Sequence, residues 1–309
     1  MKSLTDVTAE DLAQPGPDGI QPLLDILQQR YGDQLQAVLL YGSCRRDTDV
    51  HDGLVDLLAI VKSYRRTHSG WLSGTLNWSL PPNVYFLQAD SVPSPVRCKY
   101  AVITLSQFIR RCRSFSDHYF WARFTQPSRL VYTSDPSLLP GQIAVARALA
   151  ARQYCRRVAP LNPRPMTARD LWELALQTTY RCELRPEPPG NARRLIDADP
   201  DFWESLTAAL AHEGVIKKSA PNRYLSTGGS FRTAVARTEW QIRRVTGKLF
   251  NLARLFKAAG TFSNGIDYIT WKVERHSGIR VEATERMRRY PRLSAWGLAW
   301  RMWRQGGFR

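Results

Sequence analysis

No apolar stretch in this sequence reaches the roughly 18 to 20 residues needed to cross a bilayer, and no internal repeat or low-complexity tract is present. The first residues, MKSLTDVTAEDL, are acidic and have none of the features of a signal or transit peptide. Five cysteines, an odd number, show neither C-x-x-C spacing nor a Cys/His pattern typical of zinc. These absences argue against a membrane-spanning protein, a disulfide framework and a zinc site. They predict a cytoplasmic protein whose membrane contact is limited to the surface.

Basic residues are abundant. The 309 residues are 43% hydrophobic and 23% charged, which is typical of a globular chain long enough for more than one domain. The formal net charge of +17 predicts an anionic partner: nucleic acid, a nucleotide or an anionic membrane surface. Segment 241–309 alone holds 15 Lys and Arg against four acidic residues, so most of the excess charge lies there.

The stretch 37–61 carries the main chemical signal. An apolar run ends at Tyr41-Gly42-Ser43, and a second apolar run follows that contains one acid, Asp56. This pattern predicts a strand, a turn and a strand. Glycine lets backbone amides approach a phosphate, serine adds a hydroxyl donor, and a strand carboxylate can hold a magnesium ion that bridges the same phosphates. The alternative is an ordinary Gly-Ser turn, but a charge inside an apolar strand is costly unless it is paired or bound to metal.

A second strand is predicted over 97–105. Alternation places Lys99, Ala101 and Ile103 on one face and Cys98, Tyr100 and Val102 on the other. Lys99 could bind a triphosphate as a point charge, and the alternative is a solvated lysine at the end of a strand.

The remaining elements follow from periodicity and breakers. Residues 1–19 end in a Pro/Gly cluster and are interpreted as a leader, and a helix is predicted from Ile20 to the glycine at 32. Strands are predicted at 84–87 and 130–132. One helix is predicted over 105–123, where a lone histidine, His118, is interpreted as structural.

The second half is predicted to be helical and basic. Thr167 and Asp199 can each cap a helix, and two short extended pieces follow around Pro221, a pattern that suggests a winged-helix-like module. Near the end, Trp296, Trp300 and Trp303 share one face of a predicted helix beside basic residues. Such a face suits the headgroup region of an anionic bilayer, and the alternative is docking on the protein's own core.

These motifs resemble the mitochondrial-type phosphatidate cytidylyltransferases, also called CDP-diacylglycerol synthases, in their bacterial members. The similarity is carried by the following segments: Tyr41-Gly42-Ser43, Val55-Asp56-Leu57, Lys99–Ile103, Tyr119–Arg123 with Pro127, Gly247-Lys248, Lys257–Phe262 and Asp267-Tyr268. The wider superfamily has Asp-x-Asp on the second strand. Here Leu54 stands in place of the first Asp, with Asp52 just upstream.

The resemblance implies an α+β architecture in three parts: a nucleotidyltransferase domain with a mixed sheet (1–140), a winged-helix-like helical domain (141–240) and a basic, Trp-rich, membrane-associating C-terminal segment (241–309). It implies magnesium-dependent transfer of CMP from CTP to phosphatidate on the inner face of the membrane, and it disfavours nucleic acid as a partner. The expected metal ligands are Asp56 and Asp52. The expected catalytic and nucleotide-binding residues are Tyr41, Gly42, Ser43, Asp56, Lys99, Tyr100 and Arg123.

The residues themselves leave two other functions open. One is nucleotide transfer to RNA or to a small hydroxyl acceptor, and the other is a non-catalytic basic binding protein. Phosphatidate carries a phosphate monoester whose second pKa is near 6, so this nucleophile is already anionic at about pH 7 and needs no strong general base. A site with few carboxylates therefore fits phosphatidate better than it fits a hydroxyl acceptor.

Overall fold

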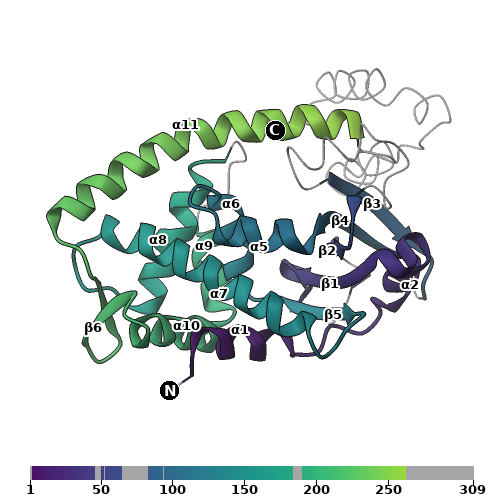
Figure 1. Cartoon of the computed structure of the whole chain (residues 1–309), viewed down its shortest axis with the longest axis horizontal. Coiled ribbons are helices and arrows are strands. Elements are labelled where there is room, and N and C mark those ends of the chain that lie inside the picture. Colours follow the sequence, from purple (N-terminus) through teal and green to yellow (C-terminus); the bar gives the residue numbers. More distant parts are fainter. Residues whose placement is uncertain are drawn as a thin grey trace.

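The computed structural model describes residues 2–45, 50–51, 53–64, 83–92, 94–183 and 190–261, with only the backbone described at 83 and 249–261. The described residues form an α+β fold with a five-stranded mixed sheet, a helical layer and a separate two-stranded hairpin (Figure 1). The α+β class expected from the sequence is therefore confirmed.

The sheet has the strand order β3-β4-β2-β1-β5. The strands are β1 (Leu35–Tyr41), β2 (Val55–Val61), β3 (Asn83–Ala89), β4 (Val96–Thr104) and β5 (Arg129–Thr133). Strand β2 pairs antiparallel with β1 and parallel with β4, while β3 and β5 pair antiparallel at the two edges. The strand-turn-strand prediction for 37–61 is confirmed, as are the strands predicted at 84–87, 97–105 and 130–132.

Both faces of the central strands are buried, which explains their nearly continuous apolar sequence. On one face, Val38, Leu40 and Leu57 pack toward helix α2 (Gln21–Tyr31). On the other face, Leu39 and Leu58 belong to the core that the helical layer covers. The two core clusters thus follow the two-residue alternation of the strands.

Residues 4–12 form helix α1 (Leu4–Leu12), so the interpretation of 1–19 as a leader is wrong. Ser3 and Asp6 make a capping box at its start, and Leu4, Val7 and Leu12 are buried. Asp11 is buried as well, and it pairs with Arg147 and Arg129. The Pro/Gly cluster at 14–19 therefore ends a docked helix, which packs on helices α7 and α10.

The single helix predicted over 105–123 is two helices, α5 (Leu105–Arg113) and α6 (His118–Thr125). Ser114 ends the first helix in an extended conformation. Asp117 begins the second, since its carboxylate accepts a hydrogen bond from the Phe120 N–H at 3.2 Å. An internal N-cap residue thus divides an otherwise continuous helical pattern.

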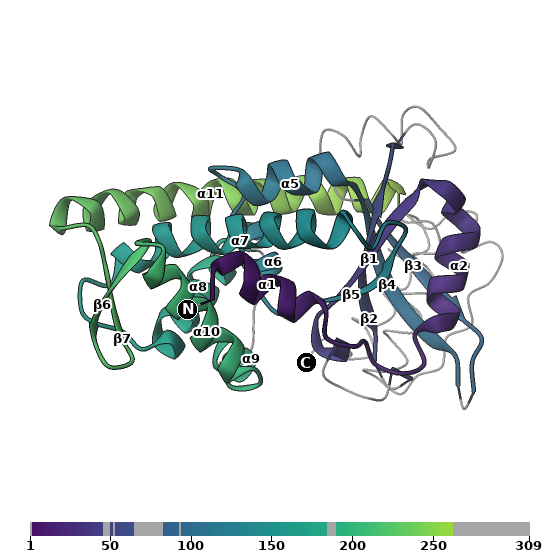
Figure 2. The same ribbon diagram turned by 60° about the horizontal axis from the view of Figure 1, so that its bottom comes forward.

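Helix α7 (Leu139–Val158) is the centre of the helical layer. Its alanines allow close approach, and it packs against α1, α5, α6 and helix α8 (Ala168–Tyr180). Figure 2 shows α1, α5, α6 and α7 on one side of the sheet and α2 on the other. One continuous apolar cluster joins the sheet to the helices on both sides of position 140. The domain boundaries at 140 and 240 stay predictions.

Beyond α8 the chain forms helices and a hairpin: α9 (Asn191–Asp197), α10 (Pro200–His212), β6 (Ile216–Ala220) and β7 (Arg223–Ser226). Thr167 caps α8 as expected. Asp199 precedes α10 as expected, although its side chain makes no cap hydrogen bond and instead pairs with Arg45 at 2.5 Å.

Helix α11 (Ser230–Thr261) is the longest described helix and runs across the position 240 boundary, along the top of Figure 1. Its inner side packs Ala236 and Trp240 into the protein. Its outer side presents four apolar residues, which we call the outer stripe: Phe231, Val235, Ile242 and Val245, exposed by 81, 38, 58 and 63%. Spacings of four, seven and three residues place them on one helical face. None of the described helices is both long and apolar enough to span a membrane.

Candidate functional site

Asp56 lies near the start of β2, at one end of the sheet, between β1 and β4. In the sheet register Tyr41, the last residue of β1, is opposite Asp56, and Asp56 is beside Lys99 of β4. Asp56 has the same alternation as Leu58 and Ile60, so its side chain is on the face of the sheet that the helical layer covers. Residues far apart in the sequence therefore meet at one end of the sheet.

Gly42 is required at the turn for two reasons. Its φ of +84° is in the region that side chains avoid, and a Cβ at this position would lie 2.8 Å from Oδ2 of Asp56. The carboxylate consequently packs directly against the backbone of the turn. Ser43, the next residue, is exposed and begins a short 3-10 helix (Ser43–Arg45).

The Asp56 carboxylate is only partly paired. Its Oδ1 atom lies 3.3 Å from the Lys99 ammonium, but this buried oxygen accepts no hydrogen bond within the part of the chain that the structure describes. The side chains are 23 and 34% exposed, so the ion pair contributes little to stability, at most about 1 kcal/mol. A buried acceptor without a donor indicates a site where a ligand can bind.

Arg123 of α6 places a second cation at this end of the sheet. Its guanidinium lies over the rings of Tyr41 (5.1 Å) and Tyr119 (5.0 Å). Burial by itself lowers the pKa of Arg123, but Tyr119, Tyr41 and Asp56 more than reverse this effect, so the net pKa is raised. Arg123 therefore stays charged. Tyr41, Gly42, Asp56, Lys99 and Arg123 form what we call the Asp56 cluster.

The Tyr41 phenol stays protonated in this cluster. Burial raises its pKa, the neighbouring carboxylate of Asp56 raises it further, and Arg123 opposes them only in part. The hydroxyl is thus a neutral group at physiological pH, able to donate a hydrogen bond.

Tyr100 is not part of the cluster. It follows Lys99 by one residue and therefore points to the opposite face, where it is fully buried. Its hydroxyl accepts a hydrogen bond from Arg30 at 2.5 Å, and its ring stacks on Tyr85. The structure brings the other predicted site residues of the sheet and α6 together but leaves Tyr100 in the core beneath α2. Asp52, Trp296, Trp300 and Trp303 lie outside the described residues.

The turn after β1 is held in place from two directions. Cys44 donates from Sγ to the Leu54 carbonyl at 3.4 Å, which connects the turn to the start of β2. Arg45 is 3% exposed and pairs with Asp199 at the start of α10. The loop next to Gly42 and Ser43 is thereby fixed to the helical layer.

Two residues near the cluster were missed by the sequence analysis. Tyr119 contacts Arg123 from one turn earlier on α6, and their spacing of four residues was the available signal. Glu183 contributes to the raised pKa of Arg123 from beyond the end of α8, and no sequence motif marks it.

The cluster offers a magnesium ion one protein carboxylate and not a full set of protein ligands. Within the described ranges, no three His, Cys, Asp or Glu side chains gather into a metal-binding group. Magnesium is, however, commonly held by one or two carboxylates with substrate phosphates completing its coordination. Oδ1 of Asp56, which accepts no hydrogen bond from the described residues, is a suitable single protein ligand of this kind.

The fold and cluster define an α+β protein with a cationic, phosphate-compatible site at one end of a mixed sheet. The chain matches no protein-family model and no curated protein at a significant level.

Proposed function

We propose that the protein is a magnesium-dependent phosphatidate cytidylyltransferase, which transfers CMP from CTP to phosphatidate and forms CDP-diacylglycerol and pyrophosphate. The observation that carries the proposal is the Asp56 carboxylate packed against the Gly42 turn, with two cations beside it and an oxygen that accepts no hydrogen bond among the described residues. The resemblance of the sequence motifs to this family supplies the substrates.

In this reaction a phosphate oxygen of phosphatidate forms a bond to the α-phosphorus of CTP, and the bond between that phosphorus and the bridging oxygen breaks to release pyrophosphate. Bound magnesium would supply charge neutralisation at the triphosphate. Asp56 would hold the ion, and the backbone at Gly42 with the Ser43 hydroxyl would contact phosphate oxygens. Lys99 and Arg123 would stabilise the negative charge that moves onto the leaving pyrophosphate.

The acceptor follows from the small number of carboxylates. A hydroxyl acceptor must lose a proton during attack, which calls for a general base. Among the described residues, the Asp56 cluster contains one carboxylate, and this carboxylate is assigned to the metal. A phosphate monoester is already ionised near pH 7, so it can attack without a base. This argument favours phosphatidate over RNA or another hydroxyl acceptor.

The outer stripe of α11 supports action at a membrane surface. Its four apolar residues are exposed on one helical face. Basic residues flank them on the same helix: Arg232, Arg237, Arg244 and Lys248. An apolar face bordered by cations suits the interface of an anionic bilayer. We propose that this stripe contacts the cytoplasmic side of the membrane, in addition to the contact expected of Trp296, Trp300 and Trp303.

The test is incorporation of radiolabel from CTP into lipid, using vesicles that contain phosphatidate, with and without magnesium. The Asp56→Asn variant should lose about 100-fold in rate, by analogy with removal of one preorganised electrostatic group. Asp18→Asn, at an exposed aspartate outside the cluster, is the matched control and should keep wild-type activity. Folded wild-type protein that makes no lipid product would contradict the proposal. Incorporation of label into RNA, when RNA is supplied in place of the vesicles, would support the hydroxyl-acceptor alternative.

A further inference from the structure

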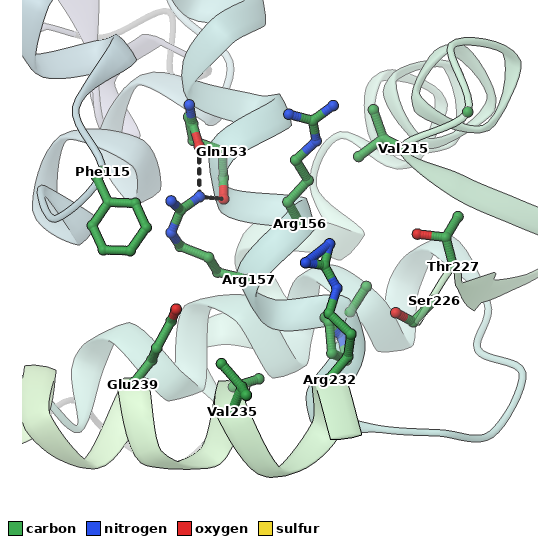
Figure 3. A pocket seen from close by; sticks show the side chains of 14 residues that line it. Phe115, Gln153, Arg156, Arg157, Val215, Ser226, Thr227, Arg232, Val235 and Glu239 are labelled. Carbon is green, nitrogen blue, oxygen red and sulfur yellow. Dashed lines mark hydrogen bonds between the residues drawn. The ribbon is translucent and has the colours of Figure 1, made fainter. Parts of the chain in front are cut away.

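A second feature is a cavity of about 340 Å³, and none of its lining residues belongs to the five-stranded sheet. The last turn of α7, the end of β7 and the start of α11 enclose it (Figure 3). The polar side chains that line it are those of Gln153, Arg156, Arg157, Ser226, Thr227, Arg232 and Glu239. No residue of the Asp56 cluster takes part, so this cavity is a separate feature.

The cavity is positively charged. Three of its lining residues are arginines, and no ion pair is recorded for any of them in the described part of the chain. Glu239 is the one acidic residue in the lining, and it already bonds to Arg243 at 2.9 Å. Burial lowers the pKa of Arg157, and so do the neighbouring cations Arg243, Arg156 and Arg232. An anion bound here would relieve this repulsion.

Arg157 is held in a fixed position. It donates from one guanidinium nitrogen to the backbone oxygen of Gln153 at 3.2 Å and to the Gln153 side chain at 2.5 Å. The guanidinium also lies over the rings of Phe115 (4.4 Å) and Trp121 (4.8 Å). A flexible arginine loses conformational entropy when it binds a ligand. Arg157 is already ordered by these contacts, so this cost is smaller and affinity is favoured.

The side chain of Arg232, which lines the cavity, lies directly against Gly228. A Cβ at Gly228 would overlap Cβ and Cγ of Arg232, so the loop before α11 must have a glycine here for the arginine to lie against it. In Figure 3 the Arg232 side chain rises from α11 toward Arg156 on α7. Side chains from two helices, 76 positions apart in the sequence, therefore converge on one space.

From this geometry we propose that the cavity binds a phosphate group. Planar guanidinium forks match phosphate oxygens in pairs, and the hydroxyls of Ser226 and Thr227 add neutral donors. The phosphate can come from a free polyphosphate or from the headgroup of a lipid. Val235 lines the cavity and also belongs to the outer stripe, so a lipid held here would have apolar surface beside its headgroup.

The first experiment is calorimetric titration of the full chain with pyrophosphate. Arg156→Gln and Arg232→Gln change exposed side chains and are expected to fold; each should weaken binding about tenfold, and the double variant more. Arg156→Lys should recover part of the affinity, because it keeps the charge but loses the fork. Arg237→Gln, at an exposed arginine of α11 outside the lining, is the matched control and should bind like wild type.

The second experiment identifies the source of the phosphate. Co-sedimentation compares phosphatidylcholine vesicles with vesicles that also contain phosphatidate. Arg232 also flanks the outer stripe, so the informative variant here is Arg156→Gln, whose residue lies on α7. Loss of its phosphatidate-dependent binding assigns the site to a lipid headgroup, whereas loss of pyrophosphate binding alone assigns it to a free phosphate. Lys99→Gln changes the Asp56 cluster and not the cavity. It should therefore leave binding in the cavity unchanged, which distinguishes the two sites.

Wild-type binding of both probes by the double variant, or no binding by the wild-type protein, would overturn the proposal. Phosphate binding in this cavity does not depend on the proposed enzymatic activity. A protein that makes no CDP-diacylglycerol can still bind phosphate in this cavity, and an active enzyme can lack the site.

Discussion

Asp11 and Asp56 both have cationic partners, but the surroundings of the two carboxylates differ. Asp11 is buried, and both of its oxygens are used: Oδ1 accepts from Arg129 at 2.6 Å, while Oδ2 accepts from Arg147 at 2.7 Å and from the Ser128 N–H at 2.9 Å. Asp56 has one lysine at 3.3 Å, and its Oδ1 accepts no hydrogen bond within the described residues.

The difference separates a structural ion pair from a binding group. A buried carboxylate with both oxygens engaged by cations has little capacity left for a ligand, and its role is to hold elements together. Here it joins α1 to α7 and to the start of β5. A partly exposed carboxylate with an unused oxygen, packed against a glycine turn, contributes little to stability and is available for chemistry.

The largest expected effect comes from disrupting Asp11, Arg129 and Arg147, which we call the structural cluster. Asp11→Asn removes the charge that neutralises Arg147, which is fully buried and has no access to water. We expect the free energy of unfolding to fall by about 3 to 5 kcal/mol, because the guanidinium is left uncompensated. Urea denaturation followed by circular dichroism measures this, with Asp18→Asn as the control. A loss below 1 kcal/mol would show that the two carboxylates do not differ as described.

A smaller effect is expected at the turn beside Asp56. Gly42→Ala places a Cβ 2.8 Å from Oδ2 of Asp56 and forces a side chain into a φ of +84°. Gly190→Ala is a matched control, since its φ is +77° but none of the described residues places an atom within 4 Å of the added Cβ. Both variants should lose about 1 kcal/mol of stability from backbone strain.

Only Gly42→Ala should also reduce cytidylyl transfer, by about tenfold or more, because it displaces the carboxylate. The measurement is the lipid-incorporation assay on both variants at equal folded concentration. Equal activity of the two would mean that the contact between the turn and Asp56 has no functional weight.

The sequence predicted the parts of this comparison that depend on local pattern. Alternation and a Gly-Ser turn predicted that Asp56 lies on a strand facing the turn, but the pairing of Asp56 with Tyr41 and Lys99 is known only from the structure. The same alternation puts Tyr100 on the opposite face, so its inclusion among the nucleotide-binding residues followed from the family resemblance of Lys99–Ile103 and not from geometry.

The structural cluster could not be predicted in the same way. Asp11 and Arg147 are 136 positions apart, and neither lies in a motif that requires the other. Residues 1–19 were interpreted as a leader because of their Pro/Gly cluster, and the capping pattern of Ser3 and Asp6, which marks a helix, was not considered. The convergence of Arg156 and Arg232 also depends on how helices pack, which local periodicity does not encode.

The smallest effect is a change in stability at alkaline pH that concerns Tyr41, the residue opposite Asp56. Its folded-state pKa is raised by burial and then by Asp56, while in the unfolded chain it titrates near the ordinary value of about 10. Below pH 10 the phenol is protonated in both states and does not affect unfolding. Above pH 10 the unfolded chain releases this proton and the folded chain keeps it, so the free energy of unfolding falls by up to about 1.4 kcal/mol per pH unit.

Tyr41→Phe removes this contribution, so its stability should fall less steeply than that of wild type between pH 10 and 11. Urea midpoints at both pH values measure the difference, and Tyr132→Phe on β5 controls for loss of a hydroxyl. Other buried tyrosines and thiols lower the stability of both proteins alike, which is why the difference between wild type and variant is the informative quantity. Parallel pH curves would show that the folded chain does not retain the Tyr41 proton, which would remove the neutral donor assigned to the Asp56 cluster.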